Sequence, residues 1–214
     1  MAKTIAILTG GGDCPGLNAV IRGVVRAANR RNWRVLGIRD GFDGLVGEPR
    51  WIDLDKNAVS GILQRGGTIL GTSNRGNPFS YPVEQDGKTE LRDVSRTVVA
   101  NFRKIGADAL IAVGGDGTLK IARQLERLGI PVVGVPKTID NDLKGTDVTF
   151  GYNTAVGIVT EALDRLHSTA ESHHRVMVVE VMGRDAGWIA LESGIAGSAD
   201  VILIPEIPYR IDKV

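Results

Sequence analysis

A cluster of charged side chains follows a short apolar run in the middle of the chain. The last six residues of the segment VGVPKTIDND, Val133–Asp142, include Lys137, Asp140 and Asp142. Transfer of a phosphoryl group to a hydroxyl needs a base at the nucleophile, and a metal and cations at the phosphate oxygens. In this interpretation Asp140 takes the proton, Asp142 positions the base or metal-bound water, and Lys137 meets the phosphate. The competing interpretation is a solvated acidic turn.

The string GGDGT, Gly114–Thr118, offers a second set of groups suited to phosphates. Its glycines let the backbone pass close to a ligand, and Asp116 can hold Mg²⁺ directly or through water. Thr118 is expected to cap the next helix and to offer its hydroxyl. The alternative is a capped turn with no ligand, and taken alone this string specifies no reaction.

The segment TGGGDCPGLN, Thr9–Asn18, is glycine-rich and precedes a predicted helix. Bare backbone amides at the positive end of a helix favour an anion site. The dinucleotide fingerprint is excluded because Pro15 stands where its third glycine should be, and no Gly-Lys-Ser/Thr follows to make a P-loop. A plain strand-to-helix turn remains the alternative.

A fourth polar cluster lies near the end of the chain, in ESHHRVMVVEVMGRDAG. Arg175 and Arg184 are expected at the two ends of one strand. The planar guanidinium group of arginine can form two hydrogen bonds to a phosphate dianion. His173 and His174 are interpreted as solvated loop residues, because no third metal ligand stands at a suitable spacing.

These clusters need a scaffold, and apolar runs alternate with helical patterns along the chain. The predicted strands are Thr4–Leu8, Arg34–Ile38, Ala109–Val113, Pro131–Val135, Arg175–Val181 and Val201–Pro205. The predicted helices are Asn18–Arg30, Ser95–Ile105, Thr118–Leu128, Tyr152–Ala170 and Trp188–Ile195. This alternation predicts an α/β fold with mainly parallel sheets. The polar clusters follow predicted strands, and ligands bind beyond the carboxyl ends of parallel strands, so the four clusters are expected to form one site.

A polar stretch near Asp142–Thr149 predicts a boundary between two lobes, residues 1–142 and 143–214. Residues 78–90 are expected to form a surface hairpin around Asp86–Gly87. The formal charge of +1 suggests neither nucleic acid nor an anionic membrane as a partner. A single cysteine, Cys14, and no apolar stretch of signal-peptide or membrane-span length favour a cytoplasmic protein.

The motifs together resemble the 6-phosphofructokinase family. The strings GGDCPGLNAVIRGVVR, RGGTILGTS, GGDGT, PKTIDNDLKGTD, SHHR and VMGRDAGWIA occur in the family's order and at familiar spacing, from about Thr4 to Pro208. TIDND followed by MGR is highly specific to that family, whereas NAD kinases and diacylglycerol kinases share only GGDGT. The resemblance implies two Rossmann-like lobes, the first binding nucleotide and the second binding sugar phosphate.

The resemblance also implies a reaction in glycolysis: the γ-phosphate of ATP passes to the 1-hydroxyl of fructose 6-phosphate, giving fructose 1,6-bisphosphate and ADP. It implies Mg²⁺, a cytoplasmic enzyme, and a homotetramer that is often allosteric, with sites at subunit interfaces. Roles carried over by motif place the nucleotide phosphates at Gly11, Gly115, Asp116, Gly117 and Thr118, with Asp116 on the metal. The sugar phosphate would meet Thr138, Ile139, Asp140, Arg175, Met182, Gly183 and Arg184, with Asp140 as base, Arg184 steadying the transferring group, and Arg175 reaching from a neighbouring subunit.

Three departures from the family pattern are visible. Gly117 favours ATP, since pyrophosphate users typically carry aspartate there, whereas Lys137 is the residue that pyrophosphate users carry. Asn74 stands where the nucleotide-contacting arginine is expected, with Arg75 one place later. The sequence also ends before the family's last sugar-phosphate residues. A pyrophosphate-dependent enzyme and a non-catalytic nucleotide or sugar-phosphate binding fragment are therefore the alternatives to an ATP-dependent kinase.

Overall fold

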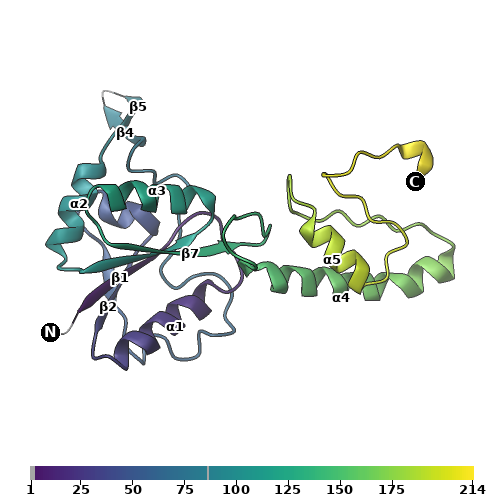
Figure 1. The fold of residues 1–214 in the computed structure, drawn as a ribbon, viewed down its shortest axis with the longest axis horizontal. Helices are drawn as coiled ribbons and strands as arrows, with labels where there is room; N and C mark the ends of the chain where they lie inside the picture. Colours follow the sequence, from purple (N-terminus) through teal and green to yellow (C-terminus); the bar gives the residue numbers. More distant parts are fainter. Residues whose placement is uncertain (1–2, 86) are drawn as a thin grey trace. The chain divides into compact units, whose positions relative to one another are not determined.

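A computed structural model describes residues 3–85 and 87–214 (Figure 1). Contacts divide the chain into two compact units, one extending to Lys137 and the other comprising Thr138–Val214. The boundary between the lobes of the protein, placed between residues 142 and 143 from the sequence, stays a prediction.

The first unit is built on one sheet. Its strands are β1 (Thr4–Thr9), β2 (Arg34–Ile38), β3 (Trp51–Asp53), β6 (Ala109–Gly114) and β7 (Val132–Thr138), in the order β3-β2-β1-β6-β7. The pairs β1–β2, β1–β6 and β6–β7 are parallel, and only β3 runs antiparallel to its neighbour. This arrangement confirms the predicted α/β class with a mainly parallel sheet. It also brings the turns after β1 and β6 to one edge of the sheet, where ligands of such folds bind.

Helices cover both faces of this sheet, as Figure 1 shows: α1 (Leu17–Asn29) on one side, α2 (Ser95–Lys104) and α3 (Asp116–Arg127) on the other. Successive strand residues point to opposite faces, so Ala6 and Leu8 pack with α2 and α3 while Ile7 packs with α1. A strand buried on both faces reads as a continuous apolar run, which is why TIAIL predicted β1 correctly.

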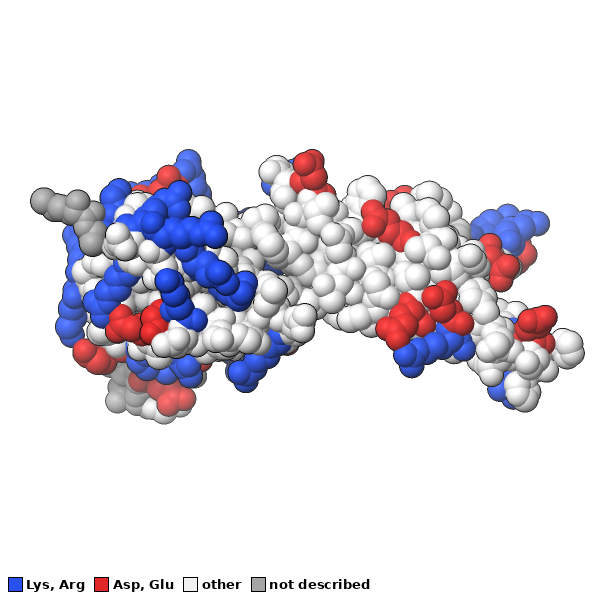
Figure 2. Space-filling view, turned by 90° about the horizontal axis from the view of Figure 1, so that it is seen from below, with Lys and Arg blue, Asp and Glu red and all other residues white. Residues whose placement is uncertain are grey.

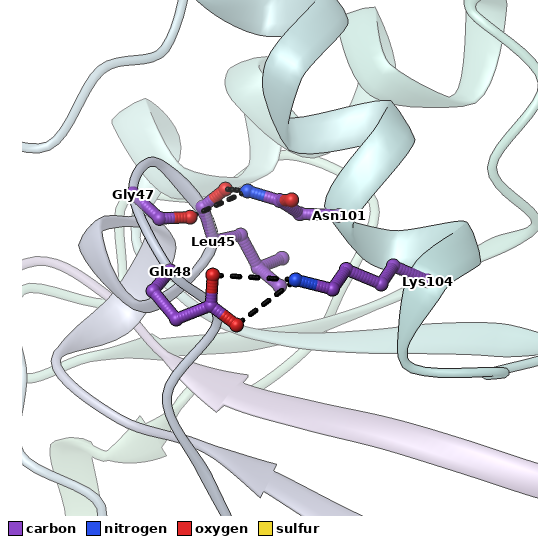
Figure 3. Close-up of polar contacts among 5 residues, drawn as sticks. All are labelled: Leu45, Gly47, Glu48, Asn101 and Lys104. Atoms are coloured by element: carbon purple, nitrogen blue, oxygen red, sulfur yellow. Dashed lines mark hydrogen bonds and ion pairs between the residues drawn. The ribbon is translucent and has the colours of Figure 1, made fainter.

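Two smaller features complete the first unit. The hairpin of β4 (Tyr81–Gln85) and β5 (Lys88–Arg92) confirms the prediction for this region, although Asp86 lies outside the described residues. A 3₁₀ turn, η1 (Gly41–Leu45), is tied to α2. Figure 3 shows the Asn101 amide donating to the carbonyls of Leu45 (2.8 Å) and Gly47 (2.7 Å), with Lys104 and Glu48 forming an ion pair beside it.

Charge is distributed unevenly along the chain. Basic residues outnumber acidic ones up to Lys137, and acidic residues outnumber basic ones from Thr138 on. Figure 2 shows several Lys and Arg side chains on the face of the first unit that carries α1. The near-zero formal charge of the whole chain therefore hides a basic first unit, which suits the binding of anions.

The second unit contains a two-residue strand β8 (Phe150–Gly151), the helices α4 (Tyr152–His173) and α5 (Trp188–Ala196), and a final 3₁₀ turn η2 (Ile211–Lys213). The buried Tyr152 joins the two helices, because its hydroxyl donates to the carbonyl of Trp188 at 3.2 Å. A 2.7 Å hydrogen bond between His167 Nε2 and the carbonyl of Gly197 links them at a second point. Among the described residues, no helix is both long enough and apolar enough to cross a membrane.

Two predicted strands are wrong. Residues 175–181 and 201–205 have no regular secondary structure. Both are rich in β-branched residues, which favour strands. A strand forms, however, only where a neighbouring strand pairs with it and a surface packs against it. Within the described part of the second unit no such neighbour is present, and Val176 and Val178 remain 91% and 90% exposed.

Candidate active site

Thr118 fills the space between the turns that follow β1 and β6. It is buried, and a Cβ atom on Gly10 would lie 2.7 Å from its hydroxyl oxygen, while one on Gly114 would lie 2.5 Å from it. Only glycine allows this approach from either side. The N-cap of α3 is Gly115 and Thr118 is the third residue of the helix, so the prediction that Thr118 caps the helix is wrong. Its role in the structure is to hold two glycine turns together.

The N-terminus of α3 presents backbone amides and one carboxylate. Asp116 is the first residue of the helix; its carboxylate is exposed and lies 2.6 Å from Lys120 Nζ. Gly117 is also exposed, and a Cβ atom there would meet nothing within 4 Å. Helix N-termini attract anions through their unpaired N–H groups and the helix dipole. This turn therefore offers a phosphate site with open space around it.

A metal ion held here needs oxygens from its ligand. Among residues 3–85 and 87–214, no group of three or more His, Cys, Asp and Glu side chains could hold an ion by itself. Mg²⁺ is commonly bound through one or two carboxylates together with the phosphates of a substrate. The exposed carboxylate of Asp116 fits that arrangement if its ion pair with Lys120 opens and the carboxylate binds the metal instead.

Lys137 brings a buried cation to the first glycine turn. Its side chain is 4% exposed, and Nζ donates to the carbonyl of Gly12 at 2.6 Å. A Cβ atom on Gly11, whose φ is +82°, would lie 3.6 Å from that nitrogen. Burial lowers the pKa of Lys137, and the nearby Cys14 and Asp13 oppose the shift. A cation with little water around it, at the edge of a glycine turn, is well placed for phosphate oxygens.

The segment before the β4–β5 hairpin also reaches this turn. The Gly11 N–H donates to the carbonyl of Ser73 at 3.0 Å, and the Thr72 hydroxyl donates to the carbonyl of Gly11 at 2.6 Å. Asn74 and Arg75 follow directly in the chain, and both are exposed. The backbone thus places both residues next to Gly11, as expected for groups that contact a nucleotide.

In the second unit, the turn that carries Asp140 is fixed by residues that sequence reasoning missed. Thr149 is 2% exposed; its hydroxyl donates to the carbonyl of Thr138 at 2.7 Å, and its N–H donates to Asn141 Oδ1 at 2.9 Å. Asn141 adopts a left-handed conformation with φ of 52°. The sequence carries no sign of this arrangement, because a threonine eleven residues away has no periodic relation to the turn.

The surroundings of Asp140 suit a base. The carboxyl is partly buried, and this burial raises its pKa, with repulsion from Asp142 adding to the effect. Hydrogen bonding by Thr138 and the charge of Arg184 act in the opposite direction. A carboxylate with a raised pKa accepts a proton more readily than a free aspartate does. Ile139, between Thr138 and Asp140, is partly buried.

The segment Met182–Arg184 forms a tight turn. Gly183 has φ of 141° and a Cβ atom there would lie 2.3 Å from the carbonyl oxygen of Ala186, so the turn requires glycine. Met182 and Arg184 are exposed. Arg175 is also exposed and follows His174, the left-handed residue that ends α4. Since no strand joins Arg175 to Arg184, the prediction that they occupy two ends of one strand is wrong.

The structure therefore assembles two groups of the expected residues. The first unit brings together Gly11, Gly115, Thr118 and Lys137, with the backbone of Asn74 and Arg75 beside them. The second unit groups Thr138, Asp140 and Arg184, and within its described residues no hydrogen bond or ion pair joins Arg175 to them. These features define a protein of the α/β class with glycine turns suited to phosphate groups.

Comparison with known proteins identifies the family. The family model described as Phosphofructokinase matches residues 4–214, and the chain belongs to this family. It is 64% identical over 214 residues to ATP-dependent 6-phosphofructokinase 2 of Clostridium perfringens, covering 99% of this chain and 58% of that protein. It is 57% identical over 212 residues to ATP-dependent 6-phosphofructokinase of Chloroflexus aggregans, covering 99% and 59%.

The fold is also similar to that of a solved phosphofructokinase structure. The phosphofructokinase of Pichia pastoris, determined in the T-state, shares 37% identity with a TM-score of 0.84, covering 97% of this chain and 23% of that one. The chain thus spans a little under three fifths of the length of the curated relatives it matches.

Proposed function

We propose that the protein transfers the γ-phosphate of ATP to the 1-hydroxyl of fructose 6-phosphate, giving fructose 1,6-bisphosphate and ADP, as a cytoplasmic enzyme of glycolysis. The observation that carries the proposal is the partly buried Asp140 carboxyl on a turn fixed by Thr149, where burial also raises its pKa. Relatives at 64% and 57% identity bear the name ATP-dependent 6-phosphofructokinase, which supports the same reaction.

The first unit would bind the nucleotide. Gly11 and the segment Gly115–Thr118 would cradle its phosphates, and Asn74 or Arg75 would contact them from the neighbouring segment. Asp116 would hold Mg²⁺ together with phosphate oxygens. The metal would neutralise charge on the transferring group when it is bound.

The second unit would bind the sugar phosphate. Thr138, Ile139, Met182 and Gly183 would line its site. Asp140 would accept the proton of the 1-hydroxyl as that oxygen attacks, and Arg184 would steady the phosphoryl group. Its planar guanidinium matches phosphate oxygens, and its exposure leaves it free to do so.

Arg175 would serve a site shared between subunits. It is exposed, and it has no ion pair among the described residues of its own chain. We propose that it reaches the 6-phosphate bound by a neighbouring copy in a homo-oligomer, the tetramer typical of the family.

ATP is favoured as donor by Gly117. Neither backbone conformation nor packing demands glycine there, since φ is not positive and a Cβ atom would meet nothing within 4 Å. The requirement for a small residue would then come from the bound nucleotide. Lys137 favours the second candidate, a pyrophosphate-dependent enzyme, because pyrophosphate users carry that residue.

A coupled assay of fructose 1,6-bisphosphate formation tests the proposal, with ATP and pyrophosphate as alternative donors. We expect turnover with ATP and little with pyrophosphate; comparable or faster turnover with pyrophosphate would overturn the donor assignment. Asp140→Asn should lower kcat by about 10²–10⁴-fold while leaving ATP binding nearly unchanged. Calorimetric binding of ATP·Mg²⁺ without any product would instead support a non-catalytic binding protein.

A further inference from the structure

Asn18 lies at the start of α1, with its side chain almost fully buried at 1% exposure. Its amide nitrogen donates to the carbonyls of Arg65 at 2.9 Å and Gly66 at 3.2 Å, and its amide oxygen accepts from the N–H of Ile69 at 2.8 Å. One carboxamide therefore satisfies three main-chain groups of a single segment.

Hydrogen bonds rather than regular structure hold that segment. Besides those to Asn18, the Asp40 N–H donates to the carbonyl of Leu70 at 2.9 Å, and Arg39 Nη1 donates to the carbonyl of Ile69 at 3.1 Å. The stretch from Leu54 to Ser80 has no helix or strand, and long irregular segments inside a compact unit are usually functional. Its part from residue 65 to 71 has three glycines and one fully buried side chain, Leu70. A glycine-rich backbone offers little surface for packing, so polar bonds must fix its register.

The same segment continues into the phosphate-binding turn. The buried Thr9 hydroxyl donates to the carbonyl of Gly71 at 2.8 Å, and Thr72 and Ser73 are hydrogen-bonded to Gly11. The exposed Asn74 and Arg75 come next. A shift of the segment at Asn18 is therefore transmitted along a short, hydrogen-bonded backbone to the groups expected to meet the nucleotide.

We infer that Asn18 is a positioning residue for the nucleotide: its carboxamide sets the place of the segment from Arg65 to Arg75 against the Gly11 turn. The inference rests on the proposed function, because it assigns the nucleotide to this turn. Asn18 itself touches only main-chain groups of the segment, so its effect on the nucleotide is exerted through the loop.

Asn101 provides a matched control. It too is an asparagine whose amide donates to two main-chain carbonyls, those of Leu45 at the end of η1 and of Gly47 just after it (Figure 3). Asn101 lies on α2, on the opposite face of the sheet from α1. Replacing either residue by alanine removes two amide donors, and Asn18→Ala also removes the acceptor for Ile69. Only Asn18→Ala removes bonds to the segment that is hydrogen-bonded to Gly11.

The test compares Asn18→Ala with Asn101→Ala in the full-length protein. We expect Asn18→Ala to raise the dissociation constant for ATP·Mg²⁺ about tenfold or more, since each unpaired buried main-chain group costs about 1–3 kcal/mol and a tenfold change is about 1.4 kcal/mol. The KM for fructose 6-phosphate should stay the same. Asn101→Ala should lower the melting temperature less, because it loses two bonds at a half-buried site, and it should leave both constants unchanged.

Trypsin gives a readout independent of activity. Arg65 and Arg75 are exposed within the segment, and so is Arg103 on α2. In Asn18→Ala, cleavage after Arg65 and Arg75 should accelerate relative to cleavage after Arg103. If Asn18→Ala does not fold, Asn18→Ser serves instead, because it puts no charge in the buried site and keeps a polar hydroxyl there while losing the carboxamide.

The wild-type protein supplies a second measurement: saturating ATP·Mg²⁺ should slow cleavage after Arg65 more than after Arg103. The inference is overturned if the two alanine variants change ATP affinity equally, or if Arg65 is not protected. A wild-type protein that neither binds ATP nor forms product would refute the proposed function instead, and the two failures are thereby distinguishable.

Discussion

The hydroxyl of Thr149 donates a 2.7 Å hydrogen bond to the main-chain carbonyl of Thr138, two residues before Asp140. Thr149 is almost fully buried, and its N–H also reaches the side chain of Asn141. These two bonds bracket Asp140 and hold the turn in which the carboxyl lies. The orientation of the base therefore depends on a residue outside every sequence motif.

Replacing Thr149 by valine should loosen this turn. Valine keeps the shape but removes the donor, leaving a buried carbonyl unpaired at a cost of about 1–3 kcal/mol. We expect kcat to fall about tenfold, with ATP affinity unchanged. Thr160→Val is the control, because Thr160 donates only to the carbonyl of Val156 within α4. Equal kcat values in the two variants would contradict this role of Thr149.

Asp142 should govern the pH dependence of the reaction. Asp140 must be deprotonated to act as base, so the rate falls as the pH drops through its raised pKa. Repulsion by Asp142 is part of that rise, and Asp142→Asn removes it. The acidic limb of the kcat profile should then move to lower pH. A limb that stays in place, or moves to higher pH, would exclude this coupling.

Lys137 should be required for the nucleotide. Lys137→Met retains most of the buried volume but removes the cation and the bond to the Gly12 carbonyl. Because hydrogen bonds to charged groups contribute about 1.5–3 kcal/mol, the dissociation constant for ATP should rise roughly 10–100-fold. In the wild type, the pKa of Lys137 is lowered, so Lys137 loses its charge at a lower pH than an ordinary lysine does. ATP binding should therefore begin to weaken at that lower pH. Titration calorimetry across pH measures both effects.

Thr118 and the two glycines make a prediction about stability. Gly10→Ala forces a Cβ atom to within 2.7 Å of Thr118 Oγ1, which should destabilise the protein by about 1–3 kcal/mol. Adding Thr118→Ala should restore part of this loss, because it removes the two nearest atoms and leaves the Thr118 Cβ atom at 3.4 Å. The same addition should not rescue Gly114→Ala, whose Cβ atom would lie 2.5 Å from that retained atom. Chemical denaturation of the single and double variants provides the comparison.

Lys120 should compete with the metal for Asp116. Their ion pair is largely exposed, so it contributes at most about 1 kcal/mol. Lys120→Met should therefore lower the Mg²⁺ concentration needed for half-maximal nucleotide binding by roughly two- to fivefold. Lys104→Met breaks a comparable exposed pair with Glu48 (Figure 3) and should leave that concentration unaltered. A higher requirement for Mg²⁺ in Lys120→Met would show that Lys120 assists the metal.

The first unit could be predicted from sequence because its elements are specified locally. Continuous apolar runs mark β1 and β6, and the amphipathic pattern of α1 places its ends within one residue of those expected. The glycine turns were recognisable for the same reason, since each follows its strand directly. Periodicity and turn residues are properties of a few neighbouring positions.

Local sequence patterns predicted the second unit less well. Residues 175–181 have the composition of a strand, but a strand exists only through its partners, which local sequence does not specify. The bonds of Thr149 to Thr138 and of Asn18 to Ile69 are equally non-local. Motifs therefore identified the residues expected to touch ligands. They included Asn18 without indicating its positioning role, and they did not include Thr149.

Gly117 has a consequence for how donor use could diverge within the family. The fold places no constraint of its own on that position, since a side chain there would project into empty space. A substitution at position 117 would therefore be selected for its effect on the donor and not for its effect on folding. A lineage could exchange one phosphoryl donor for another at this site by a single codon change, without a compensating substitution elsewhere in the unit.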